Sequence, residues 1–436
     1  MKKTNKNAAR QAAEPNHTLS AGQAPFTKYQ VFIVAILAIL QFTIILDFMV
    51  LSPLGAQLIQ ELEISTQQFG WVVSAYAFSA GASGLLAAGF ADKFDRKKLL
   101  LFFYAGFILG TLFCGLAPDY HFLLAARVIT GLFGGVIGSI SFAIITDLFP
   151  LQMRGRVMGF VQMAFATSQV LGIPISLYLA NTWGWHSPFL LIVGVSVIVG
   201  LAIARYMKPI KAHLQLQSDR NAFRHLAGIV SNPHYLKGFA AITLLATGGF
   251  MLMPFASAFT VYNLGIDLET LPMLYMATGI SAMVFGPLIG KLSDRLGKYK
   301  VFFWGSILTM VVVVIHCNMG ISPLWLVLLV NVIMFVGITA RMISASALMT
   351  AIPESSDRGA YMSIQSSVQQ ISGGLASAFA GLIVVQTSEG TLEHYDLLGY
   401  LVVLSSIVTI VMMLLIDRSV KQKADDKALA TEKVVA

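Results

Sequence analysis

The sequence predicts an all-α membrane protein in which twelve transmembrane helices form two six-helix bundles that repeat each other in parallel orientation. Three observations carry this prediction: an apolar composition, a series of apolar runs of spanning length, and an internal repeat. Of the 436 residues, 56% are hydrophobic and only 11% are charged, and the mean hydropathy is +0.76. Because soluble domains contain about 25% charged residues, this composition indicates a polytopic membrane protein.

A run of about 20 mostly apolar residues is long enough to cross a bilayer as a helix. The expected spans form an N-terminal bundle (31–207) and a C-terminal bundle (237–416), joined by a linker (208–236) and flanked by tails (1–30 and 417–436). No short apolar run with a small-residue cleavage site precedes the first span, so we expect no cleavable signal peptide. The twelve spans are expected at approximately residues 31–53, 68–91, 98–117, 121–147, 157–180, 187–207, 237–262, 271–293, 299–320, 322–351, 359–386 and 397–416.

The basic residues predict the orientation of the chain. If the N-terminus is cytoplasmic, 27 of the 29 Lys and Arg residues fall in cytoplasmic segments or at the inner ends of spans. This distribution follows the positive-inside rule and places both termini in the cytoplasm, with a bacterial plasma (inner) membrane as the expected location. The net charge of +8 is therefore explained by topology and by anionic lipid headgroups, and we expect no nucleic-acid partner.

The two halves of the chain share short matching segments at an offset of about 201 to 204 residues. A repeat of six spans in the same orientation places a shared cavity near the middle of the membrane, between the halves. The matching pairs are "DFMVLSP" (47–53) with "GFMLMP" (249–254), "LEIS" (62–65) with "LGID" (264–267), "ADKFDRKK" (91–98) with "SDRLGKYK" (293–300), and "FPLQMRG" (149–155) with "IPESSDRG" (352–359).

The loop between spans 2 and 3 and its copy between spans 8 and 9 carry a charged motif. The second copy contains Gly290, Asp294, Arg295, Gly297 and Lys298. The first copy, residues 88–97, keeps Asp92, Lys93, Arg96 and Lys97 but has Ala88 and Asp95 at the glycine positions. These motifs resemble the loop signature of the major facilitator superfamily, Gly-x-x-x-Asp-Arg/Lys-x-Gly-Arg-Lys, and the resemblance covers nearly the whole chain.

In that family this loop is a conformational gate, and the resemblance implies the same role here. Basic loop residues engage acids or helix ends across the cytoplasmic face and hold the two halves in one state. Asp147, at the inner end of span 4, is the expected partner of Arg96. The alternative is that the basic residues serve topology alone. The expected gate residues are Asp92, Arg96, Lys97, Asp147, Gly290, Asp294, Arg295 and Lys298.

Spans 4 and 5 extend the resemblance. In span 4, Arg127 is followed by Gly131, Gly134 and Gly138 near one helical face, a spacing that lets another helix approach closely. Proton-coupled exporters of the family usually carry Gly-x-x-x-Gly-Pro-x-x-Gly-Gly in span 5, and this chain matches that motif only in part. The segment "VLGIP…LANTWGW" is more similar to the drug and sugar efflux permeases, of which arabinose-efflux-type proton antiporters are an example.

Asp47 is the only acidic residue that the sequence places well inside a span, and a bare carboxylate in hydrocarbon is costly. Asp47 and Arg127 each lie six residues, about 9 Å, from the outer ends of spans 1 and 4. Their matched depth predicts an ion pair that lowers the cost of burying either charge. The pair has two possible roles: a static brace between the spans, or a proton-coupling site in which Asp47 takes up and releases a proton as the cavity alternates.

Arg341 lies below the middle of span 10, and the sequence places no acidic partner for it in any span. Arg341 is not the repeat copy of Arg127, because the internal repeat aligns Arg127 with Asn331. Arg341 either contacts an anionic or polar group of the substrate, or extends toward the interface or bonds oxygen atoms such as that of Ser344. Amides of the repeat-related spans 5 and 11 either bind a hydroxylated substrate or join helices. The expected cavity residues are Arg341, Asn331, Gln162, Gln169, Gln365 and Gln369.

These features predict a secondary transporter that works by alternating access, with proton-coupled efflux of drugs, sugars or metabolites as the main interpretation. A proton-coupled importer or facilitator of a metabolite is the alternative, and a transporter-like sensor is a weaker one. The sequence has no Walker-type phosphate loop, Cys/His metal cluster or nucleophile elbow. We therefore expect neither enzyme activity nor a cofactor. The expected partners are a small-molecule substrate, protons and the lipid bilayer, and the chain is expected to act as a monomer.

Overall fold

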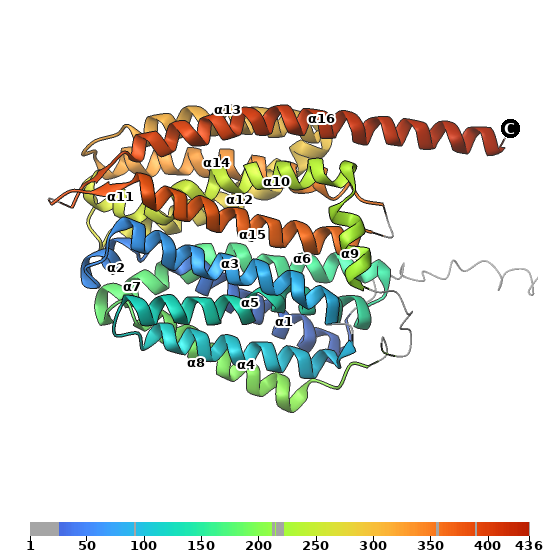
Figure 1. Ribbon diagram of the computed structural model, residues 1–436, viewed down its shortest axis with the longest axis horizontal. Coiled ribbons are helices and arrows are strands. Elements are labelled where there is room, and N and C mark those ends of the chain that lie inside the picture. Colours follow the sequence, from blue (N-terminus) through green and yellow to red (C-terminus); the bar gives the residue numbers. More distant parts are fainter. Residues whose placement is uncertain are drawn as a thin grey trace, which may run out of the picture.

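The computed structural model describes residues 26–90, 93–211, 214, 222–354, 357–388 and 390–435. Within these residues the chain forms two helical bundles that lie side by side, the N-terminal half in blue and green and the C-terminal half in yellow to red (Figure 1). The predicted all-α fold is confirmed, with one short β-hairpin as an addition.

The N-terminal bundle contains the segments expected as spans 1 to 6. Asp95 and Asp119 begin the third and fourth of these spans as N-caps, since their carboxylates accept the backbone N–H groups of Lys97 and Phe122. The elements are α1 (Lys28–Val50), α2 (Gly55–Glu61), α3 (Thr66–Phe90), α4 (Arg96–Gly115), α5 (Tyr120–Leu148), α6 (Leu151–Thr167), the π-helical turn η2 (Ser168–Gly172), α7 (Ile173–Trp183) and α8 (Ser187–Tyr206).

A short helix, α9 (Ala222–Val230), lies in the linker and precedes the C-terminal bundle. That bundle repeats the order of long helices of the first bundle. Its elements are α10 (Pro233–Leu252), the 3-10 turn η4 (Met253–Phe255), α11 (Ala256–Tyr262), α12 (Leu271–Leu296), α13 (Lys298–Cys317), α14 (Leu324–Met349), α15 (Arg358–Ile383), β1 (Val385–Gln386), β2 (Leu392–Glu393) and α16 (Tyr395–Val435).

Two expected spans are interrupted, each for a local reason. Span 5 consists of α6, η2 and α7, because a π-helical turn at Ser168–Gly172 precedes Pro174. Proline has no backbone N–H, so it cannot donate the hydrogen bond that an α-helix needs at that position. The preceding turn therefore adopts a different hydrogen-bond spacing. Span 7 likewise passes through η4 at Pro254 before it continues as α11. Both interruptions place irregular backbone next to the boundary between the bundles.

The structure revises three details of the expected spans. Among the described residues, eleven helices are long and apolar enough to cross a membrane, so the predicted number of twelve is not confirmed. The remaining long helix, α15, corresponds to span 11 and is not among them. Its mean hydropathy is too low, because its sequence contains Gln365, Gln369, Gln370 and several serines. After α15 the chain forms the antiparallel hairpin β1–β2 where span 11 was expected to continue. Helix α16 continues through Val435, into the segment expected to be a tail.

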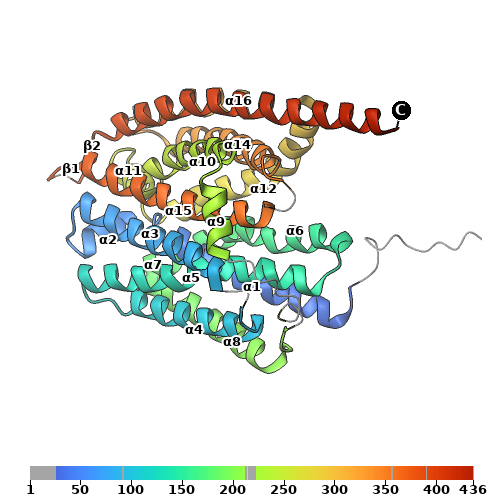
Figure 2. The same cartoon turned by 45° about the vertical axis from the view of Figure 1, so that its right-hand side comes forward.

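The molecule has two distinct ends, which we call the hairpin face and the tail face. The hairpin face carries β1–β2 and the short helices α2 and α11, at the left of Figure 1. The tail face is the opposite end, where α1 begins and α16 leaves the bundle. Figure 1 shows α9 at this end, and Figure 2 shows it beside the boundary between the bundles. The positive-inside pattern predicts that the tail face is cytoplasmic.

The bundles meet most closely where α3 packs against α15, and glycines permit this approach. A Cβ on Gly70 would lie 2.9 Å from the carbonyl oxygen of Ser377, and a Cβ on Gly381 would lie 2.9 Å from that of Thr66. The hydroxyl of Ser74 donates a 2.8 Å hydrogen bond to the carbonyl of Gly374 across the same contact. Small residues at such a crossing let backbones approach without a large side chain between them.

Hydrogen bonds between the halves gather near the hairpin face and hold it closed. The hydroxyl of Ser257 donates to the carbonyl of Ser52 at 2.8 Å, and that of Tyr262 donates to the carbonyl of Ala56 at 3.0 Å. Asn181 donates to the carbonyl of Leu268 at 2.8 Å. In these bonds a side chain of one half satisfies a backbone carbonyl of the other, so the contact needs no ion pair.

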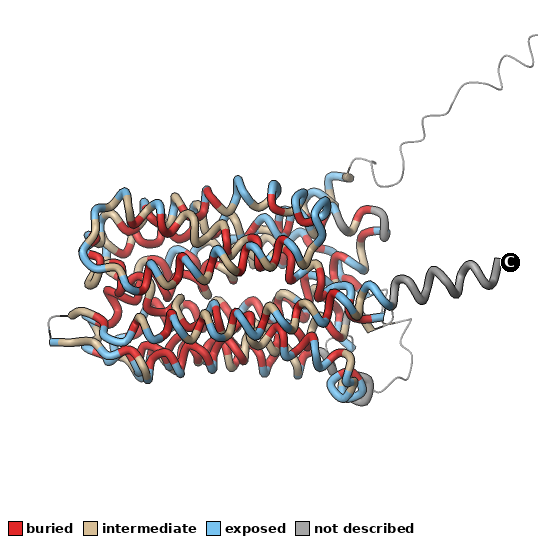
Figure 3. Tube along the Cα trace, turned by 90° about the horizontal axis from the view of Figure 1, so that it is seen from above, coloured by how far each residue is buried: buried red, intermediate tan, exposed pale blue. Residues whose placement is uncertain are grey.

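The outward-facing sides of the helices carry the exposed residues, while the buried ones line the contacts between helices (Figure 3). Many exposed side chains are large and apolar, including Trp183, Ile198, Leu201 and Trp304. An exposed apolar belt of this extent would be unstable in water and fits a hydrocarbon surrounding.

The α3–α15 contact generates a testable prediction. Gly70→Val should hold the halves apart near the hairpin face, because the added side chain meets the backbone at Ser377 and Gly381. Ala56, on α2, is fully buried in this structure. A cysteine introduced there should therefore react several-fold faster with a membrane-impermeant maleimide in the Gly70→Val background. Gly194→Val is the matched control, since a Cβ at Gly194 meets nothing within 4 Å. Equal labelling in both backgrounds would contradict the interpretation.

Candidate functional site: an interface cavity and a buried ion pair

A cavity of about 470 Å³ lies between the two bundles. Its volume is in the range of small-molecule sites, and most of its wall belongs to the C-terminal half. The lining residues are Phe48, Met49, Ser52, Pro53, Phe165, Gln169, Ile173, Leu245, Gly248, Gly249, Phe250, Leu252, Met253, Ala256, Thr260, Leu274, Tyr275, Thr278, Thr309, Val313, His316, Asn331, Met334, Phe335, Ile338, Arg341, Met342, Ser366, Gln369, Gln370, Tyr395 and Val402.

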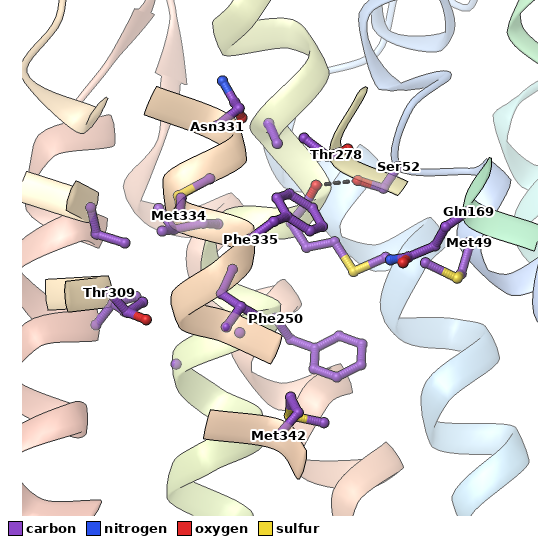
Figure 4. A pocket seen from close by; sticks show the side chains of 18 of the residues that line it. Met49, Ser52, Gln169, Phe250, Thr278, Thr309, Asn331, Met334, Phe335 and Met342 are labelled. Carbon is purple, nitrogen blue, oxygen red and sulfur yellow. Dashed lines mark hydrogen bonds between the residues drawn. The ribbon is translucent and has the colours of Figure 1, made fainter. Parts of the chain in front are cut away.

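Helix α14 provides one continuous wall of the cavity. Its lining residues run from Asn331 to Met342 at successive spacings of one or three, so they lie on one face of the helix. In Figure 4, Asn331, Met334, Phe335 and Met342 follow one another along this helix. At 1.5 Å per residue the wall is about 16 Å long.

The N-terminal half closes the opposite wall with residues of α1, α6, η2 and α7. Met49, Ser52 and Gln169 approach from that side in Figure 4. Ser52 also donates a hydrogen bond to the carbonyl of Met253, which is another cavity residue. Both halves therefore contribute to the site, as the repeat predicted.

Arg341 lines the cavity near the end of the α14 wall that is closer to the tail face. Only 5% of the residue is exposed, and its Nε has no hydrogen-bond partner. The expected alternative partner, Ser344, instead lies 3.3 Å from the hydroxyl of Ser293. Among the residues that the structure describes, no carboxylate pairs with Arg341. The guanidinium is thus a buried cation that no residue in the described part of the chain neutralises.

The amides expected in the cavity divide into two groups. Asn331, Gln169 and Gln369 line it, and the structure adds Gln370. The side chain of Asn331 also donates to the carbonyl of Val327 at 2.9 Å within α14. Gln162 is exposed on α6, and Gln365 is buried on α15; neither lines this cavity. The expectation for these two residues therefore has no support from the present geometry.

Asp47 and Arg127 form the ion pair that their matched depth predicted. An Nη atom of Arg127 lies 2.8 Å from Oδ2 of Asp47, and neither residue is exposed. The hydroxyl of Thr111 donates to Oδ1 of Asp47 at 3.1 Å. The guanidinium also lies over the ring of Tyr76, 4.6 Å from its centroid. Carboxylate and guanidinium thus have polar or aromatic neighbours from four helices, α1, α3, α4 and α5.

The pair lies inside the N-terminal bundle and does not line the cavity, although α1 does. Phe48, the next residue after Asp47, does line the cavity. Its ring lies 5.3 Å from that of Tyr76 and 5.8 Å from that of Phe250 in the other half. Aromatic rings therefore separate the ion pair from the cavity in this conformation. They also connect the two, because Tyr76 contacts both Phe48 and Arg127.

The structure brings Arg96 and Asp147 together at the tail face, as expected for the gate. Nε of Arg96 lies 3.0 Å from Oδ2 of Asp147. Asp95, at the position where a glycine is usual, accepts the backbone N–H groups of Lys97 at 2.9 Å and Ile210 at 3.2 Å. Lys97 itself donates to the carbonyl of Ala204 at 2.8 Å. Asp92, the remaining gate residue of this half, lies outside the described residues.

In the second copy of the gate motif, the charged residues form no ion pair with another described residue. Asp294 and Arg295 lie at the end of α12 and are exposed, and Gly290 and Lys298 are partly buried. Gly297, with a φ of 98°, ends α12 and begins α13, a backbone conformation that favours glycine. The geometry of the turn explains Gly297, whereas the ion pairs expected for a gate are present only in the first copy among the described residues.

Two residues of the site were missed by sequence reasoning. His316 lies in the last turn of α13, where it is buried and lines the cavity. Tyr76 has no charge and resembles any other aromatic residue of an apolar span. Its spacing from Arg127 gives no signal, because the contact depends on the close approach of α3 and α5. Gly131 permits that approach: a Cβ there would lie 2.4 Å from the carbonyl oxygen of Tyr76.

Comparison with known proteins agrees with this architecture. An uncharacterized MFS-type transporter of Bacillus subtilis (strain 168), YceJ, is 30% identical over 270 residues, which cover 61% of this chain and 68% of that protein. Multidrug resistance protein 3 of the same organism is 31% identical over 155 residues, which cover 36% of this chain and 30% of that protein.

A solved structure has the same fold. The crystal structure of a bacterial homolog of the human lysosomal transporter Spinster, in an inward-facing and unoccupied conformation, aligns with a TM-score of 0.69 and 16% identity, and covers 91% of this chain and 97% of that one. The sequence matches the model of the Major Facilitator Superfamily over residues 37–245 and again over residues 238–435. Because these matches span both bundles, the chain belongs to the major facilitator superfamily, whose members are membrane transporters and not enzymes.

Proposed function

We propose that this protein exports small organic solutes in exchange for protons, by alternating access through the interface cavity. The observation that carries the proposal is the arrangement of a cavity between two similar bundles beside a fully buried Asp47–Arg127 pair. A solute site shared by both halves is accessible from one side at a time if the halves rock about it. The similarity to a protein named for multidrug resistance supports efflux.

Asp47 is the proposed proton site because it is a buried carboxylate in the last turn of the cavity-lining helix α1. Asp47 and Phe48 are adjacent, so their side chains leave the helix in different directions, one toward the ion pair and the other toward the cavity. Movement of Phe48 when the cavity fills or the halves rock also moves the backbone of Asp47. A change in the Asp47–Arg127 distance alters the balance between the charged and neutral carboxyl. In this way the same helix links solute binding to proton binding.

Import or facilitated diffusion of a metabolite is the second candidate. Span 5 favours it, because the exporter motif is incomplete there: Ser168 stands at a glycine position and a π-helical turn occupies Ser168–Gly172. Gly172 still permits close packing, since a Cβ there would lie 2.7 Å from the side chain of Leu46 on α1. The direction of transport decides between the two candidates.

Asp47→Asn should abolish transport driven by a pH gradient while exchange of labelled for unlabelled solute continues. The amide keeps the shape of the carboxyl and its contact with Thr111, but it does not bind a proton. Both activities are measured in proteoliposomes. Glu61→Gln, at an exposed carboxylate on α2, is the control and should behave as the wild-type protein. Undiminished pH-driven uptake in Asp47→Asn would exclude Asp47 as the proton site.

The ion pair also has a predicted effect on stability. Asp47→Arg or Arg127→Asp alone should destabilise the protein by about 3–5 kcal/mol, because each leaves a buried charge without its partner. The double exchange restores opposite charges and should recover part of that loss. Cys114 and Cys317 are buried free thiols, so a thiol-reactive dye reports thermal unfolding. If the double variant is no more stable than the single ones, the two residues do not interact as a pair.

Inside-out membrane vesicles test the direction of transport. An exporter that exchanges solute for protons should accumulate a labelled solute in the vesicle lumen when the lumen is acid, and a protonophore should abolish the accumulation. An importer driven by protons should expel the solute under the same gradient. Vesicles that contain the Asp47→Asn variant are the control, because they keep the bilayer and the gradient but lack the proposed proton site.

A further inference from the structure

The cavity contains a charge imbalance that the proposed function does not use. Arg341 is the one formally charged residue of its lining, and among the described lining residues there is no aspartate, glutamate or lysine. The remaining wall is mainly aliphatic, aromatic or thioether, with a few hydroxyls and amides. A buried cation without a counter-ion is costly, and such residues in membrane proteins mark substrate pathways.

We propose that the cavity binds small organic monoanions with an apolar body, and that Arg341 holds the anionic group. This inference rests on the proposed transport function and names its substrate class. A carboxylate or sulfonate on the occupant supplies the partner that Arg341 lacks. A planar guanidinium suits such a group, because it donates two parallel hydrogen bonds to two oxygen atoms.

The depth of Arg341 places the anionic end of the occupant toward the tail face. Arg341 lies eight residues before the end of α14, and Ser366 lies eight residues after the start of α15, so both are about 12 Å from the tail-face ends of their helices. Gln369, one turn further along α15, also lines the cavity. A hydroxyl and an amide at this level donate further hydrogen bonds to an anion and add no charge.

The rest of the wall favours an apolar body over a highly charged one. Beyond Arg341, α14 presents Ile338, Phe335 and Met334 before it reaches Asn331. Methionine and phenylalanine adapt to different shapes but do not solvate charge. One arginine neutralises one negative charge, so a dianion would leave a charge buried against this wall. A cation would meet Arg341 without any carboxylate to offset the repulsion.

Alternative roles for Arg341 are less consistent with the geometry. A side chain that extends to the interface would be exposed, whereas Arg341 is 5% exposed. A guanidinium that joins helices would bond carbonyls, hydroxyls or a carboxylate, but no described carboxylate pairs with Arg341, and Ser344 lies against Ser293. Arg127 shows what a structural arginine looks like in this chain, since it is fully buried with a carboxylate at 2.8 Å.

Matched ligands test the proposal on the purified full-length protein. The probes are 4-phenylbutyrate, 2-naphthylacetate and octanoate, each beside its neutral primary amide, and binding is read from the shift in unfolding temperature reported by the buried thiols. At least one carboxylate should bind wild-type protein at least about tenfold more tightly than its amide, the size expected for a charge-assisted hydrogen bond. If no carboxylate is preferred to its amide, the proposal is wrong.

Variants assign the preference to Arg341. Arg341→Gln should lose it, with the carboxylate bound about tenfold more weakly and the amide unchanged, and Arg341→Lys should keep part of it. Lys237→Gln, which removes an exposed charge from the same bundle, should bind as wild type does. Without ligand, Arg341→Gln should unfold at no lower temperature than wild type, because the charge it removes has no partner. A preference that survives in Arg341→Gln, or a marked loss of stability in the unliganded variant, would overturn the assignment.

Failure of this inference is distinguishable from failure of the proposed function. If proteoliposomes accumulate neutral or cationic solutes in an Asp47-dependent manner while no probe anion is preferred, transport stands and the substrate class is wrong. If an anion binds through Arg341 but no solute moves under a pH gradient, the anion site stands and proton coupling is wrong.

Discussion

The structure depends on how the charges of two buried arginines are compensated, because the hydrocarbon region cannot solvate them. In the N-terminal half, Arg127 is neutralised by Asp47, and Thr111 and Tyr76 complete its surroundings. Removal of Asp47, Arg127 or Thr111 leaves a buried polar atom without its partner. Tyr76 adds a cation–π contact, so the group ties α1, α3, α4 and α5 to one another. In the C-terminal half Arg341 has no such shell and borders the cavity. One bundle is therefore electrostatically closed, and the other is open to a ligand.

The contact between the bundles is of a different kind from the contacts within them. At Gly70 and Gly381 backbones meet directly, and nearer the hairpin face the hydroxyls of Ser257 and Tyr262 bond carbonyls of the other half. Such bonds are short, uncharged and easily replaced by water when the surfaces part. A surface of this type suits two rigid bodies that separate and rejoin. A buried ion pair at the same place would resist separation, because each charge would lose its partner.

Sequence reasoning predicted the features that depend on counting along the chain. Spanning length gave the long helices, and equal distances from the outer ends of two spans gave the Asp47–Arg127 pair. Sequence reasoning failed where the rotation of a helix about its axis decides which side chains line the cavity. Gln369 lines the cavity and Gln365 does not, although they are four residues apart on α15. Both amides belong to the same polar part of α15, so the pattern of residue types does not reveal which of them meets the cavity.

Local backbone features account for the other differences. The hairpin β1–β2 forms across residue 386, where span 11 was expected to end, because the polar and glycine residues of "QTSEGT" favour a turn. The π-helical turn at Ser168–Gly172 shifts the register of span 5, and there Gly279 of α12 packs against the backbone of Gln169. Gln169 lines the cavity, whereas Gln162, two turns earlier, is exposed. Residues seven apart in an α-helix lie on nearly the same face, so the two amides differ in their depth along the span, which the pattern of residue types does not reveal.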